Sequence, residues 1–130
     1  MRKELIEQNP LLKLSIEFSL SVISYCEILN VERKYILSKQ LLRSATSIRA
    51  NSMEAQNPES KADFIHKIKI AAKEADETQY WLILCEKAKD YPVPVGLQQQ
   101  LEVLNKILGS ILSTAKRKTP FSYFLSFFTL

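Results

Sequence analysis

The sequence predicts an all-α protein: an antiparallel up-down-up-down, left-handed four-helix bundle that assembles into a ring-shaped homo-oligomer. Two observations predict the helices. Apolar residues recur three and four positions apart through four long segments, and only two glycines and five prolines interrupt the 130 residues. The short connections make consecutive helices antiparallel neighbours. We expect one bundle domain over 1–118, with helices at about 10–29, 32–56, 60–89 and 96–118, and an aromatic tail over 119–130.

The first predicted helix is the most apolar. It begins at Asn9-Pro10, which supplies an N-cap and then a proline at the first helical position. Two apolar stripes run along it, one of Leu12, Ile16, Leu20 and Ile23 and the other of Leu14, Phe18, Val22, Tyr25 and Leu29. So wide an apolar arc predicts a helix that lies deep in the bundle or gives one face to another subunit.

Matching seams run along the two central helices. The seam of 32–56 consists of Leu37, Leu41, Ala45, Ile48 and Ser52, and the seam of 60–89 consists of Phe64, Ile68, Ala71, Ala75, Thr78, Leu82 and Cys85. The small Ala71 and Ala75 allow a neighbouring helix to approach closely. Between these helices, Ser60 and Asp63 have the spacing of a capping box.

The fourth helix follows a proline-rich connector at 91–96. Its seam alternates by four and three residues through Leu97, Leu101, Leu104, Leu108, Ile111 and Ala115. Gly109 lies inside this helix, and we expect it to mark a close contact.

The tail that follows has no charged side chain between Phe121 and Leu130 and is too short to cross a bilayer as a helix. A strap over the bundle or over a neighbouring subunit is favoured over a membrane role.

Composition limits the partners, the compartment and the membrane roles that are compatible with this sequence. The net charge of +4 and the isoelectric point near 9.1 permit an anionic partner without requiring one. Cys26 and Cys85 lie on apolar faces and are expected to be buried thiols in a reducing compartment. The charged N-terminus has no signal-peptide pattern, and no apolar run approaches the length of a membrane span. We expect a cytoplasmic protein without a membrane role.

Patterns that indicate catalysis are scarce. His66 is the one histidine, and its neighbours Lys67 and Lys69 suggest a surface position. The sequence has no Glu-x-x-His repeat, no metal-ligand pair and no glycine-rich phosphate loop. We therefore expect no enzymatic activity, no metal and no cofactor.

A polar stripe follows the back of the second helix, at Arg43, Ser47, Asn51 and Glu54. It is either a solvated face with weak local pairs or the partner of polar groups on another helix. In the second case, Glu74 and Glu77 are the carboxylates that Arg43 would meet. The pattern favours neither interpretation.

Basic residues gather on the two central helices. Such a run is usually a solvated face, but a ring of several copies would pool the charge into a surface for phosphates. Binding would then be salt-sensitive and directed to the backbone of RNA or DNA. The candidate phosphate contacts are Lys39, Arg49, Lys67, Lys69 and Lys73.

Part of the sequence resembles a known family. The run from Gln40 to Ala45, Ser47-Ile48, Asn51 and Glu54, with Phe64 and Glu77, is similar to the four-helix-bundle proteins encoded in intervening sequences of bacterial large-subunit ribosomal RNA genes. These were once labelled a ribosomal protein family, and the accessory variability proteins of diversity-generating retroelements look similar. The resemblance covers about 14–118.

The resemblance implies a homopentameric barrel with a basic surface and no enzymatic activity. The similarity to the retroelement proteins implies that nucleic acid and a reverse transcriptase are partners. By position, Arg43, Ser47, Asn51, Glu54 and Glu77 match the polar residues of the family, which implies a role in packing or assembly. Arg49 stands where the family usually has proline, and Ala55 stands where it commonly has glycine. No kink is therefore expected at Arg49, and the second helix is expected to run further.

Two functions follow from these patterns. The first is a non-enzymatic oligomer that binds RNA or DNA without strong sequence preference. The alternative is a protein-binding scaffold or accessory subunit, with no nucleic-acid role, that holds a partner through the apolar face of the first helix or through the tail.

Overall fold

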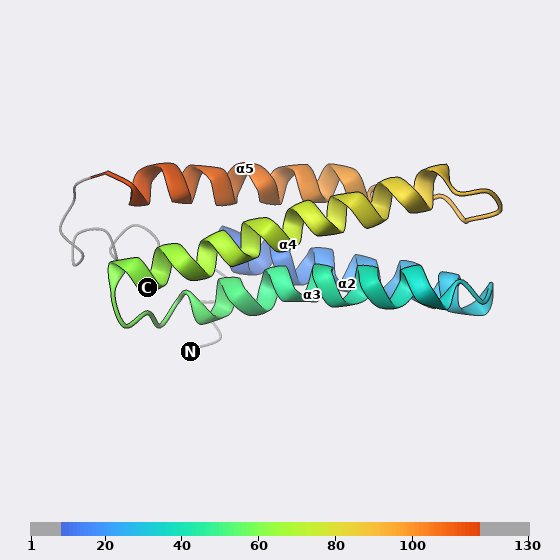
Figure 1. Cartoon of the computed structure of the whole chain (residues 1–130), viewed down its shortest axis with the longest axis horizontal. Helices are drawn as coiled ribbons and strands as arrows, with labels where there is room; N and C mark the ends of the chain where they lie inside the picture. Colours follow the sequence, from blue (N-terminus) through green and yellow to red (C-terminus); the bar gives the residue numbers. More distant parts are fainter. Residues whose placement is uncertain (1–8, 118–130) are drawn as a thin grey trace.

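The computed structural model describes residues 9–117, and these residues form four helices and no strand. The helices are α2 (Pro10–Val31), α3 (Tyr35–Glu54), α4 (Lys61–Lys87) and α5 (Leu97–Ala115). The connections from α2 to α3 and from α4 to α5 lie at one end, and the connection from α3 to α4 lies at the other (Figure 1). The predicted tail at 119–130 lies outside the described residues.

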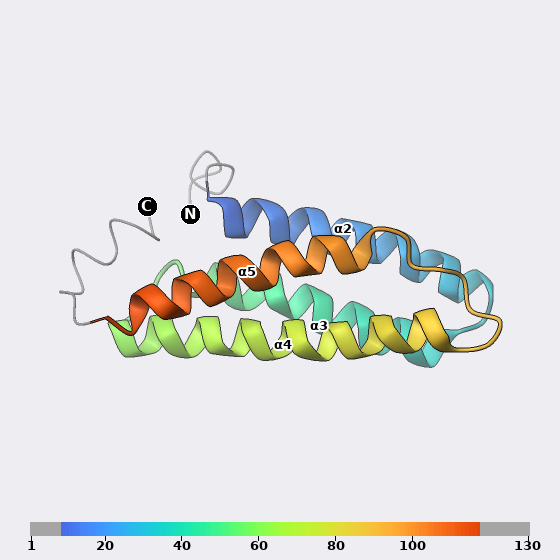
Figure 2. The same cartoon turned by 90° about the horizontal axis from the view of Figure 1, so that it is seen from above.

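Each helix packs against two others. α3 contacts α2 and α4, and α5 contacts the same two helices, so that α2 and α4 lie diagonally across the bundle. The view from above shows the same arrangement, with α5 lying between α2 and α4 (Figure 2). The outward faces of α2 and α4 therefore point to different sides of the molecule.

The helix boundaries differ from the predicted ones near residue 32. α2 continues to Val31, and α3 starts at Tyr35 rather than at 32. Arg33 has a left-handed backbone with φ of 62°, which no α-helix accommodates, so the chain must turn there before α3 begins. At its other end α3 stops at Glu54, two residues before the predicted end, and Ala55 is fully buried as the C-cap.

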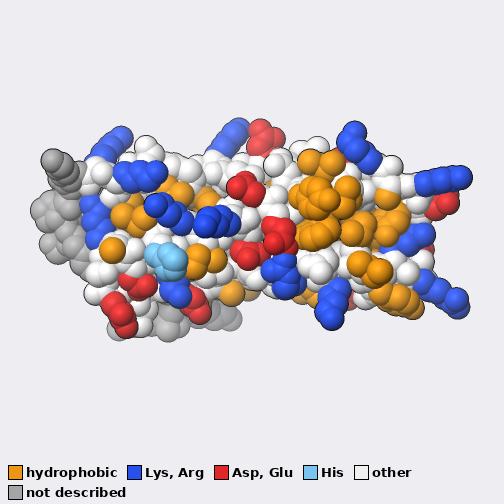
Figure 3. All heavy atoms as spheres, viewed as in Figure 1, with side chains coloured by type: hydrophobic (Ala, Val, Ile, Leu, Met, Phe, Trp, Pro, Cys, Tyr) orange, Lys and Arg blue, Asp and Glu red, His pale blue; other side chains and the backbone are white. Residues whose placement is uncertain are grey.

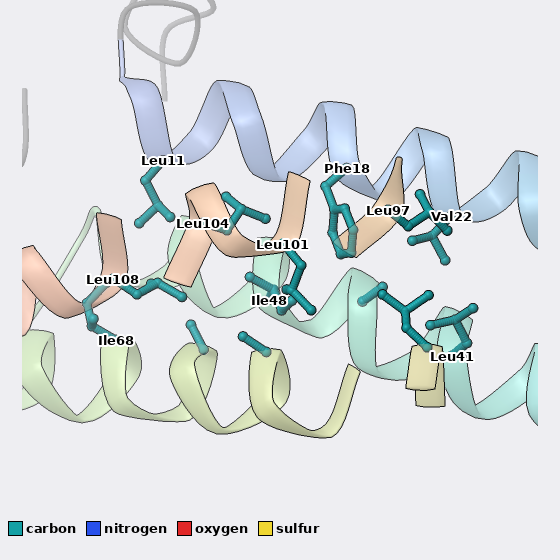
Figure 4. Packing of buried hydrophobic residues seen from close by; sticks show 14 of the residues in the cluster. Leu11, Phe18, Val22, Leu41, Ile48, Ile68, Leu97, Leu101, Leu104 and Leu108 are labelled. Atoms are coloured by element: carbon teal, nitrogen blue, oxygen red, sulfur yellow. The ribbon is translucent and has the colours of Figure 1, made fainter. Parts of the chain in front are cut away.

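The predicted caps and seams are confirmed. Asn9 caps α2, and Ser60 caps α4 by accepting from the Asp63 N–H. Every seam residue predicted for α4 and α5 is buried, and so are four of the five predicted for α3, with Leu37 half-buried against the core. Phe18, Ile48, Ile68 and Leu101, from four different helices, point into the same interior (Figure 4).

The two apolar stripes predicted for the first helix have different environments. Phe18, Val22, Tyr25 and Leu29 are buried in the core. In the other stripe only Leu12 is buried, whereas Ile16, Leu20 and Ile23 are exposed. We call these three exposed residues the α2 stripe. The expectation that no segment could span a membrane is wrong for α2 by length and composition, and 39% of its most apolar window is buried within the described bundle.

Both cysteines are buried thiols, as predicted. Cys26 Sγ donates to the Ser38 carbonyl oxygen at 3.4 Å, and Ser38 Oγ donates to the Cys26 carbonyl oxygen at 3.4 Å, which ties α2 to α3. Tyr25 Oη donates to the Pro92 carbonyl oxygen at 2.6 Å and so holds the connector before α5. Burial raises the pKa of both thiols above the ordinary value of 9.0.

Stability should fall as pH rises above about 9. Each buried thiol contributes fully to stability when the pH is below 9.0, the ordinary pKa of a cysteine thiol. This contribution is lost as the pH rises through the raised pKa that the thiol has in the folded protein. We expect urea denaturation between pH 8 and 10 to show a smaller loss for the double variant Cys26→Ala, Cys85→Ala than for the wild type. Equal losses in both proteins would show that the thiols contribute nothing.

Gly109 is not the close contact that the sequence predicts. It is exposed, and no heavy atom lies within 4 Å of the position that a Cβ would occupy. Gly109→Ala should therefore stabilise the protein by about 0.5–1 kcal/mol, since alanine loses less backbone entropy in a helix. Thermal or urea unfolding measures this change. A loss of stability would mean that the glycine has a packing role.

Candidate interaction surface on α3 and α4

The polar stripe of α3 lies on the flank that faces α4. Arg43, Ser47, Asn51 and Glu54 follow one another at spacings of four, four and three, so that they share one side of the helix. The core-facing side of α3 carries Leu41, Ala45 and Ile48 instead. This division leaves one α3 flank free to make polar contacts with α4 while the apolar face is buried.

Ion pairs join the two helices along this flank. Arg43 Nη1 lies 3.4 Å from Glu74 Oε2, and Arg43 Nη2 is paired with Glu77. Glu77 Oε2 also accepts from Trp81 Nε1 at 3.0 Å. Towards the other end, Lys67 Nζ donates to Glu54 Oε2 at 3.0 Å. The interpretation in which the stripe meets polar groups on another helix is confirmed for Arg43 and Glu54, within a single chain.

The other two stripe residues bond only to their own helix in the described part of the chain. Ser47 Oγ donates to the Arg43 carbonyl oxygen at 2.7 Å, and Asn51 Nδ2 donates to the Ser47 carbonyl oxygen at 2.9 Å. These bonds restrain the side chains without linking helices. They leave both residues half-buried on the surface of α3.

A buried polar contact lies behind the ion pairs. The hydroxyls of Ser44 on α3 and Thr78 on α4 are 2.9 Å apart, and both residues are fully buried. Thr78 is part of the predicted α4 seam, but its partner was not predicted from the sequence. A polar residue within an apolar seam was the available signal, because a buried hydroxyl requires a hydrogen-bond partner.

The five candidate phosphate contacts do not form one cluster. Lys39, Lys69 and Lys73 are exposed, and none of them has an ion pair with a described residue. Lys69 and Lys73 lie one turn apart on α4, whereas Lys39 belongs to α3. Lys67 instead pairs with Glu54, whose hydrogen bond raises the pKa of the Lys67 ammonium.

Arg49 is the least accessible of the candidates. It is half-buried, and its Nε atom is buried without a hydrogen-bond partner in the described part of the chain. Burial lowers the pKa of its guanidinium. Partial burial leaves Arg49 less accessible to a phosphate than the exposed lysines.

Charged and apolar side chains separate along the outer face of α3 and α4. Basic side chains are most frequent over one half of this face, a group of acidic side chains lies in the middle, and hydrophobic side chains gather over the other half (Figure 3). Further acidic side chains lie at the edge of the basic half, and further basic side chains surround the hydrophobic group. The apolar half carries Ile36, which is 79% exposed, and Tyr80, which is 54% exposed. The Tyr80 and Trp81 rings lie 5.0 Å apart.

We call Ile36, Tyr80 and Trp81 the aromatic patch. The pairing of Ser44 with Thr78 and of Arg43 with Glu77 sets the register of the two helices. In that register Ile36, two turns before Arg43, lies level with the turn of α4 that follows Trp81. The patch is therefore one surface built from both helices.

The described residues offer no group of three or more His, Cys, Asp or Glu side chains that could hold a metal ion. This face combines exposed aromatic, aliphatic and basic side chains on two helices that are joined by ion pairs. Aromatic and arginine side chains carry much of the binding energy at protein interfaces.

Removing Arg43 should weaken the pairing of α3 with α4. Arg43 is 47% exposed, so solvent screens its pairs and Arg43→Met should cost about 0.5–1.5 kcal/mol, part of it from leaving Glu74 beside Glu77. Lys106→Met is the control, since it breaks an exposed pair with Glu102 inside α5 and should stay within about 0.5 kcal/mol of wild type. Urea denaturation measures both, and equal losses would contradict a special role for Arg43.

Comparisons with known proteins agree with the predicted resemblance. The profile of the family described as 23S rRNA-intervening sequence protein matches residues 7–110. Among solved structures, the chain is similar to a protein of unknown function from the S23 ribosomal protein family of Bacteroides thetaiotaomicron VPI-5482, with 40% identity and a TM-score of 0.72, over 77% of this chain and 95% of that one. No curated protein matches. The chain therefore belongs to the 23S rRNA-intervening sequence protein family.

Proposed function

We propose that this protein is a non-enzymatic, cytoplasmic oligomer of up-down helical bundles that binds the backbone of RNA or DNA without strong sequence preference. The observation that carries the proposal is the set of exposed cations on the outer surface, Lys39, Lys69 and Lys73, which have no ion pair within the described residues. Exposed ammonium groups without a carboxylate partner are available to phosphates.

A single subunit offers few such contacts. Lys67 is paired with Glu54 and Arg49 is half-buried, which leaves three of the five candidate cations free. Three phosphate contacts give weak, strongly salt-dependent binding. Assembly into a ring would multiply them, and the family resemblance suggests five copies. Assembly and nucleic-acid binding are therefore parts of one proposal.

The chemistry favours contacts with the phosphate backbone over base contacts. Lys69 and Lys73 are exposed, one turn apart on the regular helix α4, where they can reach a phosphate backbone without entering a groove. Lysines of this kind neutralise phosphates but carry no sequence information.

The alternative is a scaffold that binds another protein, such as a reverse transcriptase. The exposed apolar side chains of the α2 stripe and of the aromatic patch favour it, because such surfaces are typical of protein contacts. The tail, which the same hypothesis also invokes, lies outside the described residues.

The test is binding to a single-stranded RNA of arbitrary sequence at several salt concentrations. We expect the affinity to fall steeply with salt, and Lys69→Glu with Lys73→Glu to weaken binding about tenfold or more and to flatten the salt dependence. The control is the double variant Lys106→Glu, Lys116→Glu, which changes the net charge by the same amount but on α5 and at its C-cap. It should weaken RNA binding much less.

Two outcomes would overturn the nucleic-acid role. One is the absence of binding at low salt, which would favour the scaffold. The other is an equal loss of affinity in both charge-reversed variants, which would show that net charge alone, rather than the α4 lysines, sets the affinity.

A further inference from the structure

We infer that single-stranded nucleic acid binds along the outward ridge of α4 and stacks an unpaired base on Tyr80. This inference rests on the proposed binding of RNA or DNA and deepens it in two ways. It names the strand form that the protein prefers, and it gives the aromatic patch a role in binding that strand.

The α4 ridge consists of five residues on the side of the helix opposite the buried seam. With 3.6 residues in each turn, Lys69, Lys73, Asp76, Tyr80 and Lys87 fall within about 60° of one another around the helix axis. All five side chains are exposed, whereas the seam on the opposite side is buried. One line along the surface of α4 therefore passes three cations and one aromatic ring.

The three lysines of the ridge are available to phosphates. None of them has an ion pair with a described residue. Lys73 lies about 10 Å before Tyr80 along the helix axis and Lys87 about 10 Å after it, because each is seven residues away. A nucleic-acid backbone that contacts both lysines therefore passes over the Tyr80 ring.

Carboxylates towards α3 reduce the positive charge of this face but do not lie on the ridge. Glu74 and Glu77 lie on the flank of α4 that faces α3, where Arg43 pairs with both of them. Glu77 also accepts a hydrogen bond from the Trp81 indole at 3.0 Å. These carboxylates are therefore engaged within the subunit.

Asp76 is the one carboxylate among the five ridge residues. Three lysines and one aspartate leave the ridge with a net charge of +2. Glu86 follows Asp76 by ten residues and is turned by about 100° from Lys87 around the helix axis, so it belongs to another side of α4. The ridge therefore attracts an anionic backbone, and Asp76 weakens that attraction.

The aromatic side chains of the patch are suited to an unpaired base. Tyr80 is 54% exposed, and the centroid of the Trp81 ring lies 5.0 Å from that of Tyr80. Proteins that bind single strands without sequence preference combine cations along the backbone with aromatic side chains that stack on bases. Every base has an aromatic face, so stacking adds affinity without reading sequence. A duplex keeps its bases paired and would contact only the lysines.

The test compares a single-stranded RNA with the duplex of the same sequence, at low salt and with the full-length protein. We expect the wild type to bind the single strand more tightly. Tyr80→Ala should weaken single-strand binding by about fivefold or more and leave duplex binding unchanged, because it removes the stacking surface. Tyr80→Phe keeps the ring and should retain the preference. Val103→Ala is the matched control, since it removes a side chain that is 46% exposed on α5.

Trp81 supplies a direct readout of this contact. It is the only tryptophan in the sequence, so tryptophan fluorescence comes from the aromatic patch alone. A base stacked on Tyr80 should quench this fluorescence. Inorganic polyphosphate offers phosphates without bases, and it should compete for the lysines without quenching Trp81.

Asp76→Asn tests the path of the strand along the ridge. It removes a negative charge between Lys73 and Tyr80 and should tighten single-strand binding, because the phosphates no longer meet a like charge there. Glu27→Gln removes an exposed carboxylate on α2 and changes the net charge equally. It should have a smaller effect, and equal effects of the two variants would place the strand elsewhere.

The inference fails, and the nucleic-acid proposal survives, if RNA binds in a salt-dependent way but equally to the wild type and Tyr80→Ala. That result would assign the aromatic patch to a protein partner. Equal affinity for single strand and duplex, without quenching of Trp81, would overturn the inference in the same way. Absence of RNA binding by the wild type at low salt would overturn the nucleic-acid proposal and this inference together.

Discussion

The register between α3 and α4 is the constraint on which the other features depend. The buried hydroxyls of Ser44 and Thr78 meet at 2.9 Å inside an otherwise apolar seam. A slip of either helix by one residue would break this hydrogen bond between the helices, a loss of about 0.5–1.5 kcal/mol. Each hydroxyl would keep a bond within its own helix, from Ser44 Oγ to the Leu41 carbonyl oxygen and from Thr78 Oγ1 to the Glu74 carbonyl oxygen. The small Ala71 and Ala75 beside them are fully buried and let the helices approach closely enough for this contact.

The surface follows from that register. With Ser44 opposite Thr78, Arg43 lies within reach of Glu74 and Glu77, and the same carboxylate of Glu77 orients Trp81. The polar residues that match the family therefore act first within one subunit. Two of them, Arg43 and Glu77, hold Trp81 of the aromatic patch in place, whereas Glu54 pairs with Lys67 and Ser47 and Asn51 bond to α3 itself.

Periodicity predicted the interior of this fold well and its ends less well. The seams of α4 and α5 are buried as expected, because each of these helices has a single continuous apolar seam to turn to the core. The start of α3 was missed because Arg33 adopts a left-handed turn that the residue type does not indicate. Gly109 was misjudged because a glycine in a helix suits either a close contact or open solvent.

For the candidate surface, sequence spacing predicted which carboxylates Arg43 meets, but not which lysines are free. Lys67 is not free because it pairs with Glu54, which lies thirteen residues away on another helix. Arg49 is not free because it is partly buried. The same holds for apolar residues: both stripes of the first helix are apolar, yet one lies in the core and the other is buried only at Leu12. A single subunit has one interior, so α2 can bury one stripe there, and the other remains available for a contact between molecules.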